Sequence, residues 1–398
     1  MDITIYPKKL SGTLQIIPSK SQAHRLLICA AFSDKPTKLI CPATNRDIEA
    51  TANCLNAIGA QITRTDDGYL VVPVSSVSRQ AVLDCGESGS TLRFMLPIAG
   101  ALGVDATFQM AGRLPERPLS PLWEELQRMG CTLSRPTENS INCTGRLKAG
   151  AYYIDGGVSS QFITGLLFAL ALLPGESQLQ VTGSVESKPY IEMTRQALKL
   201  FGADATDTRF NGRTPFRSPG TVFVESDWSN GAFFLGANAL GNHITLEGLN
   251  SHSAQGDRAV VEWIERLRED ITVSGKDIPD LIPILCVVAG CSKGATFENI
   301  GRLRLKESDR IDSVANMMKA LGADVQTGPD WLRVSPSTYQ GCVIDAKNDH
   351  RIAMSAAIAS TVAQGPVTIL GAECVNKSYP DFWSVFTQLG GYYEQYIR

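Results

Sequence analysis

The fold is decided by residues 55–60, L-N-A-I-G-A, because this short pattern returns along the chain. An apolar helix end, a glycine and a small residue recur at 126–131, 198–203, 318–323 and 386–391. A sixth copy, at 264–270, keeps the helix end without the glycine. Glycine after a helix accepts the left-handed backbone that stops it, so each copy predicts a helix C-terminus. Successive copies within each half are about 70 residues apart, which predicts six similar units in two sets of three.

Each unit also contains a second helix that is apolar nearly all round. These helices are predicted at 21–32, 91–102, 160–173, 228–240, 281–289 and 352–363. A helix without a polar face is buried, whereas amphipathic helices such as 46–58 and 309–321 lie nearer to solvent. Short strands such as 70–74 and 367–370 complete the units. We therefore predict an α/β protein whose domains have helical cores wrapped by sheets, with an ordinary α/β sandwich as the alternative.

Length and composition restrict the class of protein. A chain of 398 residues is long for one core, so two domains are expected. The formal charge of -3 argues against nucleic acid as a partner, and no apolar run is long enough to span a membrane. The first residues, M-D-I-T-I-Y, predict a strand and not a signal peptide. Ten cysteines without a C-x-x-C pair and four scattered histidines favour a reduced cytoplasmic protein without a metal site.

One stretch, residues 85–94 (C-G-E-S-G-S-T-L-R-F), has the features of an anion site. Gly86 and Gly89 let the backbone approach a ligand, and Arg93 lies one turn past Gly89 at the start of an apolar helix. Helix N-termini attract anions through their free N–H groups. Read alone, the stretch fits a capping turn equally well. It lacks the lysine of a phosphate-binding P-loop.

Other polar groups stand before or inside apolar helices. Arg25 follows Lys20 and Ser21 in an apolar run, where an anionic ligand or a structural salt bridge is expected. Asp280 likewise enters an apolar run, and a desolvated carboxylate is a candidate general base. The loop 112–118 carries two arginines and 306–310 is K-E-S-D-R; each alone also fits a solvated surface.

The motifs become specific when they are taken in order. P-S-K-S-x-x-H-R, C-G-E-S-G-S-T-L-R-F, S-S-Q-F, S-K-P-Y, K-E-S-D-R, D-H-R-I-A-M and K-S-Y-P-D-F follow one another from Pro18 to Phe382. This ordered set closely resembles the 5-enolpyruvylshikimate-3-phosphate (EPSP) synthases over nearly the whole chain. The resemblance implies the two-domain enolpyruvyl transferase fold, an inside-out α/β barrel with three β-α units in each domain. It places one domain at 1–18 plus 222–398, the other at 19–221, and the active site in the cleft between them.

The resemblance also implies a reaction. The carboxyvinyl group of phosphoenolpyruvate would pass to the 5-hydroxyl of shikimate 3-phosphate by addition and elimination through a tetrahedral intermediate, with release of phosphate. This is a transferase step of the shikimate pathway of aromatic amino acid biosynthesis. It implies a monomer that needs no cofactor and no metal and binds neither nucleic acid nor membrane.

Residue roles follow from the same resemblance. It implies that shikimate 3-phosphate is held by Lys20, Ser21, Arg25, Ser159, Ser160, Gln161, Ser187, Tyr190, Asp280 and Lys306. It implies that phosphoenolpyruvate is held by Lys20, Gly89, Arg93, Arg117, Gln161, Arg310, Arg351 and Lys377. Asp280 would be the base at the 5-hydroxyl and Glu307 the proton carrier at the enol carbon, with Lys20 and Lys306 assisting.

Two positions depart from one branch of the family: Glu87 stands where asparagine is common, and Phe94 replaces a proline. Gly89 leaves room for a phosphonate slightly longer than phosphoenolpyruvate, so glyphosate is expected to compete with that substrate. One alternative is UDP-N-acetylglucosamine enolpyruvyl transferase, but its reactive cysteine has no counterpart in the loop 112–118. A non-catalytic anion-binding paralogue is the other; it should have lost Asp280, Glu307 or Lys306.

Overall fold

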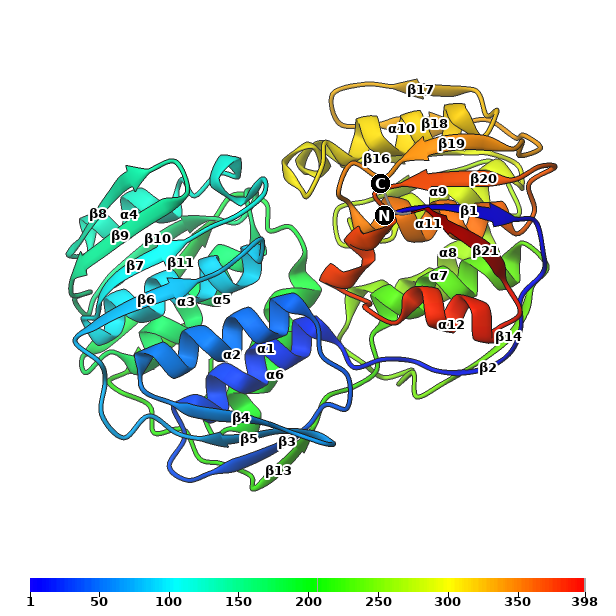
Figure 1. The fold of residues 1–398 in the computed structure, drawn as a ribbon. Coiled ribbons are helices and arrows are strands. Elements are labelled where there is room, and N and C mark those ends of the chain that lie inside the picture. The colour runs from blue at the N-terminus through cyan, green and yellow to red at the C-terminus, as the bar shows by residue number, and fades with distance from the viewer. Residues whose placement is uncertain (206, 397–398) are drawn as a thin grey trace. The chain divides into compact units, whose positions relative to one another are not determined.

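The computed structural model describes residues 1–205 and 207–396 and divides into two compact units (Figure 1). The first unit is Pro18–Glu225; the second unit is Met1–Ile17 with Ser226–Arg398. The sequence placed the boundaries after residues 18 and 221. The second boundary lies later because β13 (Thr221–Phe223) pairs with β3 (Thr37–Ile40) inside the first unit. Glu225 also belongs there, since its carbonyl accepts a hydrogen bond from the amide of Ser19 at 2.7 Å.

The described part of the first unit has a sheet for each of its three repeats. Their strand orders are β13-β3-β5-β4, β6-β7-β9-β8 and β10-β11-β12. The remaining strands are β4 (Gln61–Thr65), β5 (Gly68–Val72), β6 (Gln80–Asp84), β7 (Asp105–Gln109), β8 (Cys131–Thr137), β9 (Ser140–Gly145), β10 (Ala151–Asp155), β11 (Glu176–Thr182) and β12 (Arg209–Asn211). The helices are α1 (Lys20–Ala31), α2 (Arg46–Ile58), α3 (Gly89–Leu102), η1 (Leu114–Glu116), α4 (Leu122–Arg128), α5 (Ser160–Leu172) and α6 (Lys188–Leu200).

The second unit repeats this plan. Its strand orders are β14-β2, β15-β16-β18-β17 and β19-β20-β1-β21. The strands are β1 (Asp2–Tyr6), β2 (Ser11–Gln15), β14 (His243–Glu247), β15 (Ile271–Ser274), β16 (Ala295–Glu298), β17 (Val325–Thr327), β18 (Leu332–Val334), β19 (Cys342–Asp345), β20 (Val367–Leu370) and β21 (Tyr392–Tyr396). The helices are α7 (Trp228–Ala239), η2 (Gly256–Ala259), α8 (Val260–Arg266), α9 (Ile282–Gly290), η3 (Gly301–Leu305), α10 (Arg310–Ala320), α11 (His350–Ser360), η4 (Ala372–Lys377) and α12 (Phe382–Gln388).

A parallel strand pair brackets four of the six buried helices. The helices α3, α5, α9 and α11 each connect two neighbouring parallel strands, as in β6-α3-β7. The remaining two repeats exchange their first strands. β2 precedes α1 in sequence but pairs with β14 after α7, while β13 precedes α7 but pairs with β3 after α1. This exchange is why the chain crosses between the units twice.

The apolar helices form the two cores, as the sequence predicted. Every residue of α9 is buried, as is every residue of α5 except Gln161. Gly165 lets α5 lie directly against α3, because a Cβ there would stand 2.2 Å from the carbonyl oxygen of Arg93. The buried side chains cluster separately in the two units, and the sheets lie outside the helices in each unit (Figure 1).

The helix boundaries agree closely with the repeat pattern. The observed α2 begins and ends where the pattern predicts, and the other predicted helices differ by one to three residues at their ends. The glycines of the repeat all have positive φ, from 80° at Gly202 to 125° at Gly59. Each therefore adopts a backbone that a residue with a Cβ avoids, which is the physical reason why the helices stop there.

Candidate active site

In the first unit, the starts of α3 and α5 are joined by side chains that the sequence assigned to phosphoenolpyruvate. Gln161 donates from Nε2 to Ser90 Oγ at 2.9 Å and accepts from Arg93 Nη1 at 3.2 Å. Arg93 also donates to the carbonyl of Pro118 at 3.0 Å, next to Arg117. The guanidinium groups of Arg93 and Arg117 therefore converge on one helix N-terminus, where an anion is stabilised.

Gly89 lies directly beneath these two guanidinium groups. A Cβ at this position would stand 2.6 Å from Nη1 of Arg93 and 2.7 Å from Nη1 of Arg117. The absence of a side chain thus brings both cations against the helix start. Glu87 packs against Gly112 of the neighbouring loop, since a Cβ on Gly112 would approach its Cδ to 2.6 Å. The two loops that carry these groups are therefore in direct contact.

Lys20, at the start of α1, forms an ion pair that the sequence did not predict. Its Nζ lies 2.8 Å from Oδ2 of Asp47 in the first turn of α2. Lys20 retains 17% side-chain exposure and Asp47 retains 7%, so the pair is largely desolvated. An acid in the first turn of a helix is ordinarily explained by the helix dipole. Nothing in the local sequence therefore distinguishes Asp47 as a partner of Lys20.

Arg25 is buried, but its hydrogen-bond partners are neutral. It donates to Thr194 Oγ1 and to the carbonyl of Tyr190, both at 2.9 Å, and its guanidinium lies 5.3 Å from the ring centroid of Phe94. Burial lowers its pKa to about 10. The salt bridge offered as the alternative for Arg25 is not formed by the described residues. Phe94 instead provides an aromatic face for the cation.

The other predicted residues of the first unit lie at helix starts. Ser159 caps α5 by accepting from the amide of Gln161 at 3.3 Å, and Ser160 is the first residue of that helix. Ser187 precedes α6 with φ of 52°, a left-handed backbone that is unusual for a residue with a Cβ. Tyr190 follows in the first turn, and its carbonyl holds Arg25. Ser21 holds Arg25 in the same way, through its carbonyl at 2.5 Å.

In the second unit, a network centred on Arg310 collects most of the predicted residues. Its guanidinium is 1% exposed and donates to Asp280 Oδ1 at 3.0 Å, Glu307 Oε2 at 2.6 Å and Asp349 Oδ2 at 2.9 Å. Burial would lower the pKa of Arg310, but the three carboxylates raise it above its ordinary value. Arg310 is therefore a permanent cation.

Asp280 receives a guanidinium on each carboxylate oxygen. Arg310 Nη1 lies 3.0 Å from Oδ1, and Arg351 Nη2 lies 2.9 Å from Oδ2. Burial would raise the pKa of Asp280, but Arg351, Lys306 and Arg310 together lower it well below its ordinary value. Without an anion on these cations, Asp280 is a weak base.

Glu307 and the two lysines complete the network. Lys377 Nζ lies 3.7 Å from Oε1 of Glu307, whose other oxygen binds Arg310. Burial lowers the pKa of Lys306 to about 8, although Asp280 opposes this shift. A lysine with this pKa can exchange a proton near neutral pH. The cluster therefore combines anion-binding groups with groups that can give or accept protons.

Asp349 is the residue of this network that the sequence analysis missed. It is fully buried, and it accepts from Arg310 and from Ser308 Oγ at 3.0 Å. It also caps α11 by accepting from the amide of Arg351 at 3.0 Å. The acid of the motif D-H-R is also typical of an N-cap, so the local sequence does not reveal its second contact. Asp349 holds the guanidinium of Arg310 and the backbone amide of Arg351.

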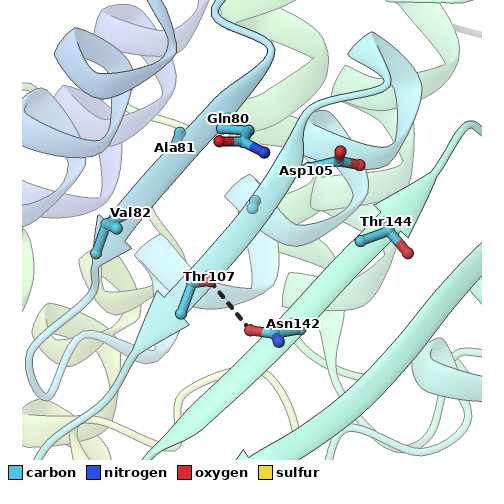
Figure 2. Close-up of a pocket in the computed structure, with 8 residues that line it drawn as sticks. Gln80, Ala81, Val82, Asp105, Thr107, Asn142 and Thr144 are labelled. Carbon is cyan, nitrogen blue, oxygen red and sulfur yellow. Dashed lines mark hydrogen bonds between the residues drawn. The ribbon is translucent and has the colours of Figure 1, made fainter.

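A separate cavity of about 390 Å³ lies on the outer face of the sheet that contains β6, β7 and β9. Figure 2 shows its lining, with Thr107 hydrogen-bonded to Asn142 at 3.0 Å. None of the predicted site residues lines it. Asp105 is the one charged group there and is acidic, so the cavity is unsuited to anions.

Among the residues that the structure describes, no helix has the length and apolar character that crossing a membrane requires. Within the same residues, no three histidine, cysteine or acidic side chains are grouped in a way that could hold a metal ion.

Solved structures identify the class of fold. An EPSP synthase from Acinetobacter baumannii has a TM-score of 0.80 at 22% identity, covering 99% of this chain and 100% of its own. The enolpyruvyl transferase NikO from Streptomyces tendae has a TM-score of 0.77 at 17% identity, covering 99% and 98%. The fold is therefore that of the enolpyruvyl transferases.

Sequence comparison identifies the family. The family model for EPSP synthase (3-phosphoshikimate 1-carboxyvinyltransferase) matches residues 5–386. A 3-phosphoshikimate 1-carboxyvinyltransferase from Clostridium beijerinckii is 37% identical, over 99% of both chains. The chain belongs to the EPSP synthase family, a family of transferases. These similarities do not favour the UDP-N-acetylglucosamine alternative.

Proposed function

We propose that this protein transfers the carboxyvinyl group of phosphoenolpyruvate to the 5-hydroxyl of shikimate 3-phosphate, releasing phosphate. Family membership supports the reaction. The observation that carries the proposal is the Arg310 network, in which the proposed base Asp280 and proton carrier Glu307 share the buried cation Arg310. Both substrates are polyanions, and such a site stabilises their charge while it supplies groups for proton transfer.

The proposed binding groups belong to both units. Phosphoenolpyruvate would meet Lys20, Gly89, Arg93, Arg117 and Gln161 of the first unit together with Arg310, Arg351 and Lys377 of the second. Shikimate 3-phosphate would meet Ser21, Arg25, Ser159, Ser160, Ser187 and Tyr190 of the first unit, with Asp280 and Lys306 of the second. Lys20 and Gln161 would serve both substrates. Turnover then requires groups from both units to act on the same pair of substrates.

The chemistry would proceed by addition and then elimination. Asp280 takes the proton from the 5-hydroxyl, whose oxygen attacks the substituted enol carbon of phosphoenolpyruvate. Glu307 delivers a proton to the terminal carbon, which completes a tetrahedral intermediate. Glu307, now a carboxylate, takes a proton back from the resulting methyl group as phosphate departs, which forms the new enol ether. Lys20 and Lys306 would stabilise the developing charges.

Substrate binding would also activate the base. In the unliganded protein, Arg310 and Arg351 hold Asp280 as a weak base. The carboxylate or phosphate of phosphoenolpyruvate competes for the same guanidinium groups. Neutralising them raises the pKa of Asp280 towards its ordinary value. The proton acceptor thereby becomes stronger when the second substrate has arrived.

We further propose that the enzyme acts in the cytoplasm as a monomer and is inhibited by glyphosate. The cysteines are free thiols, which suits a reducing compartment. The guanidinium groups of Arg93 and Arg117, which stand against Gly89, would bind the phosphonate of the inhibitor.

Phosphate release from phosphoenolpyruvate tests the reaction. With shikimate 3-phosphate as acceptor, wild-type protein should release phosphate, and Asp280→Ala should lower kcat by at least about 100-fold. Asp270→Asn is the matched control, because Asp270 pairs with Arg333 on an exposed surface. No release with shikimate 3-phosphate, but release with a UDP-sugar, would overturn the proposal.

A further inference from the structure

A chain of buried polar side chains joins α1, α2 and α3 next to the proposed phosphoenolpyruvate groups. His24 Nδ1 lies 2.7 Å from Thr51 Oγ1, which lies 2.8 Å from Thr91 Oγ1. Thr91 Oγ1 in turn donates to Ser88 Oγ at 2.8 Å. His24, Thr51 and Thr91 are fully buried, and Ser88 is 1% exposed.

This series of hydrogen-bonded side chains ends at the N-cap residue of α3. Ser88 Oγ accepts from the amide of Thr91 at 3.3 Å, so it fixes the first turn of the helix that begins at Gly89. Thr91 also reaches the carbonyl of Asp47 at 3.4 Å. The same short turn thus carries Gly89 and Arg93 on its ligand side and the hydroxyl chain on its buried side.

The contacts between α1 and α2 are matched in register. Lys20 and His24 are one helical turn apart on α1, and their partners Asp47 and Thr51 are one turn apart on α2. The side of α2 that holds Lys20 therefore also holds His24. Thr51, on this side of α2, also contacts Thr91 of α3. Lys20 and Gly89 are connected through a single set of buried contacts.

Counting protons determines which group donates and which accepts at each step of this series. The single proton of Thr91 is donated to Ser88, so Thr91 accepts from Thr51. Thr51 must then accept from His24, which requires the neutral tautomer with its proton on Nδ1. Burial lowers the pKa of His24 to about 3, which keeps the ring neutral. His24 Nε2 has no hydrogen-bond partner among the described residues.

We infer that Thr51 is a positioning residue for phosphoenolpyruvate: its hydroxyl, held between His24 and Thr91, sets the starts of α1 and α3 at the spacing that Lys20, Gly89 and Arg93 require. The inference rests on the proposed function. Thr51 does not touch substrate. It acts through the groups on either side, so its removal should change the affinity for phosphoenolpyruvate more than the rate of the bound complex.

Valine in place of threonine tests this role, because it preserves the shape and removes the hydroxyl. Thr51→Val should raise KM for phosphoenolpyruvate about tenfold, the cost of leaving buried polar partners unpaired. KM for shikimate 3-phosphate and kcat should change less than about threefold, since Lys20 is the only one of the three positioned groups that also serves that substrate and the chemistry. Thr51→Ser, which retains the hydroxyl, should restore KM for phosphoenolpyruvate.

Thr37→Val is the matched control. Thr37 is also fully buried in the first unit, where its Oγ1 lies 2.7 Å from Ser218 Oγ and contacts none of the proposed site residues. The Thr37→Val variant should lose a similar amount of unfolding free energy, while its KM for phosphoenolpyruvate should not change. Equal KM values in Thr51→Val and wild type, or failure of Thr51→Ser to restore KM, would overturn the inference.

The histidine tautomer provides a second measurement that needs no turnover. The ¹⁵N shifts of the His24 ring in wild-type protein should show a neutral ring protonated at Nδ1. Protonation at Nε2 would reverse the proton count and overturn the inference, even if Thr51→Val does not fold. Wild-type protein that shows this tautomer but no activity with both substrates would instead refute the proposed function.

Discussion

At the scale of single residues, Gly89 shows how a missing side chain creates a binding surface. Its backbone is ordinary helix, so the space above it matters more than its flexibility. Arg93 and Arg117 occupy that space with their guanidinium groups. In the sequence alone, the motif that contains Gly89 fits a capping turn equally well. The two converging arginines come from segments that local sequence does not connect.

Gly89→Ala should separate binding from stability. The new methyl displaces both guanidinium groups, so KM for phosphoenolpyruvate should rise about tenfold through weakened charge-assisted hydrogen bonds. The inhibition constant of glyphosate should rise further, because the inhibitor is longer than the substrate. Alanine favours the helix by up to about 1 kcal/mol, which offsets the hydrogen bonds that the displaced guanidinium groups lose, so the free energy of unfolding should change by less than about 1 kcal/mol. Steady-state kinetics with full urea unfolding curves check this; unchanged glyphosate inhibition would contradict it.

His24 should make stability depend on pH. Its pKa is about 3 in the folded protein, lowered by burial, against an ordinary value of 6.5. A lowered pKa means that the unfolded chain binds more protons between these values, so stability falls as pH falls below about 6.5. From pH 7 to pH 5 this one ring should cost about 2 kcal/mol of unfolding free energy. Asp47, Lys20 and Arg25 are the charged groups that influence it.

His24→Asn removes the titration and serves as the comparison. The fall in unfolding free energy from pH 7 to pH 5 should be about 2 kcal/mol smaller in the variant than in wild type. Urea unfolding at both pH values measures the difference. Contributions from Asp280 and other acids are common to both proteins and cancel. Parallel pH profiles would show that His24 does not remain neutral in the folded protein.

At the scale of the elements, the repeated helix–glycine–strand pattern explains most of the architecture. The glycine stops the helix, and the following strand pairs outside it. The structure nevertheless distinguishes glycines that look identical in sequence. A Cβ on Gly59 would stand 2.4 Å from the carbonyl oxygen of Ser76, whereas a Cβ on Gly390 would meet nothing within 4 Å.

The two glycines should therefore differ in their tolerance of alanine. Gly390→Ala should cost about 1 kcal/mol, the ordinary penalty of a left-handed residue with a Cβ. Gly59→Ala should cost about 3 kcal/mol or more, because its φ of 125° and the backbone clash add to that penalty. Chemical unfolding of the two variants measures the difference. Equal losses would mean that the backbone around Ser76 yields easily.

At the scale of the whole molecule, the buried side chains form two separate cores that share a single chain. The pairing of β2 with β14 gives the second unit sequence from both sides of the first, whereas the first unit is one continuous segment. Most of the groups proposed for shikimate 3-phosphate belong to the first unit, whereas the proposed base and proton carrier belong to the second. Each unit should therefore unfold in its own transition, and a ligand should shift the transition of the unit that binds it.

Thermal unfolding should show more than one transition, because each unit has its own core. Shikimate 3-phosphate should raise the midpoint of the transition that belongs to the first unit by mass action. Calorimetry with hydrogen exchange, read from peptides of residues 18–225 and of 226–396, assigns the transitions. A single transition with equal calorimetric and van't Hoff enthalpies would contradict this expectation.

The sequence by itself determined the local features: the helices, their stops, the apolar cores and the identity of most charged groups. These depend on periodicity, on glycine conformation and on side-chain chemistry, which are properties of short segments. Tertiary structure alone decided the strand exchange, the pairing of Asp47 with Lys20, and the use of Asp349 to hold Arg310. It also showed that neutral oxygens and the Phe94 ring, not a carboxylate, surround Arg25. Such contacts join residues far apart in the chain, and only three-dimensional packing selects one partner among many of the same chemical type.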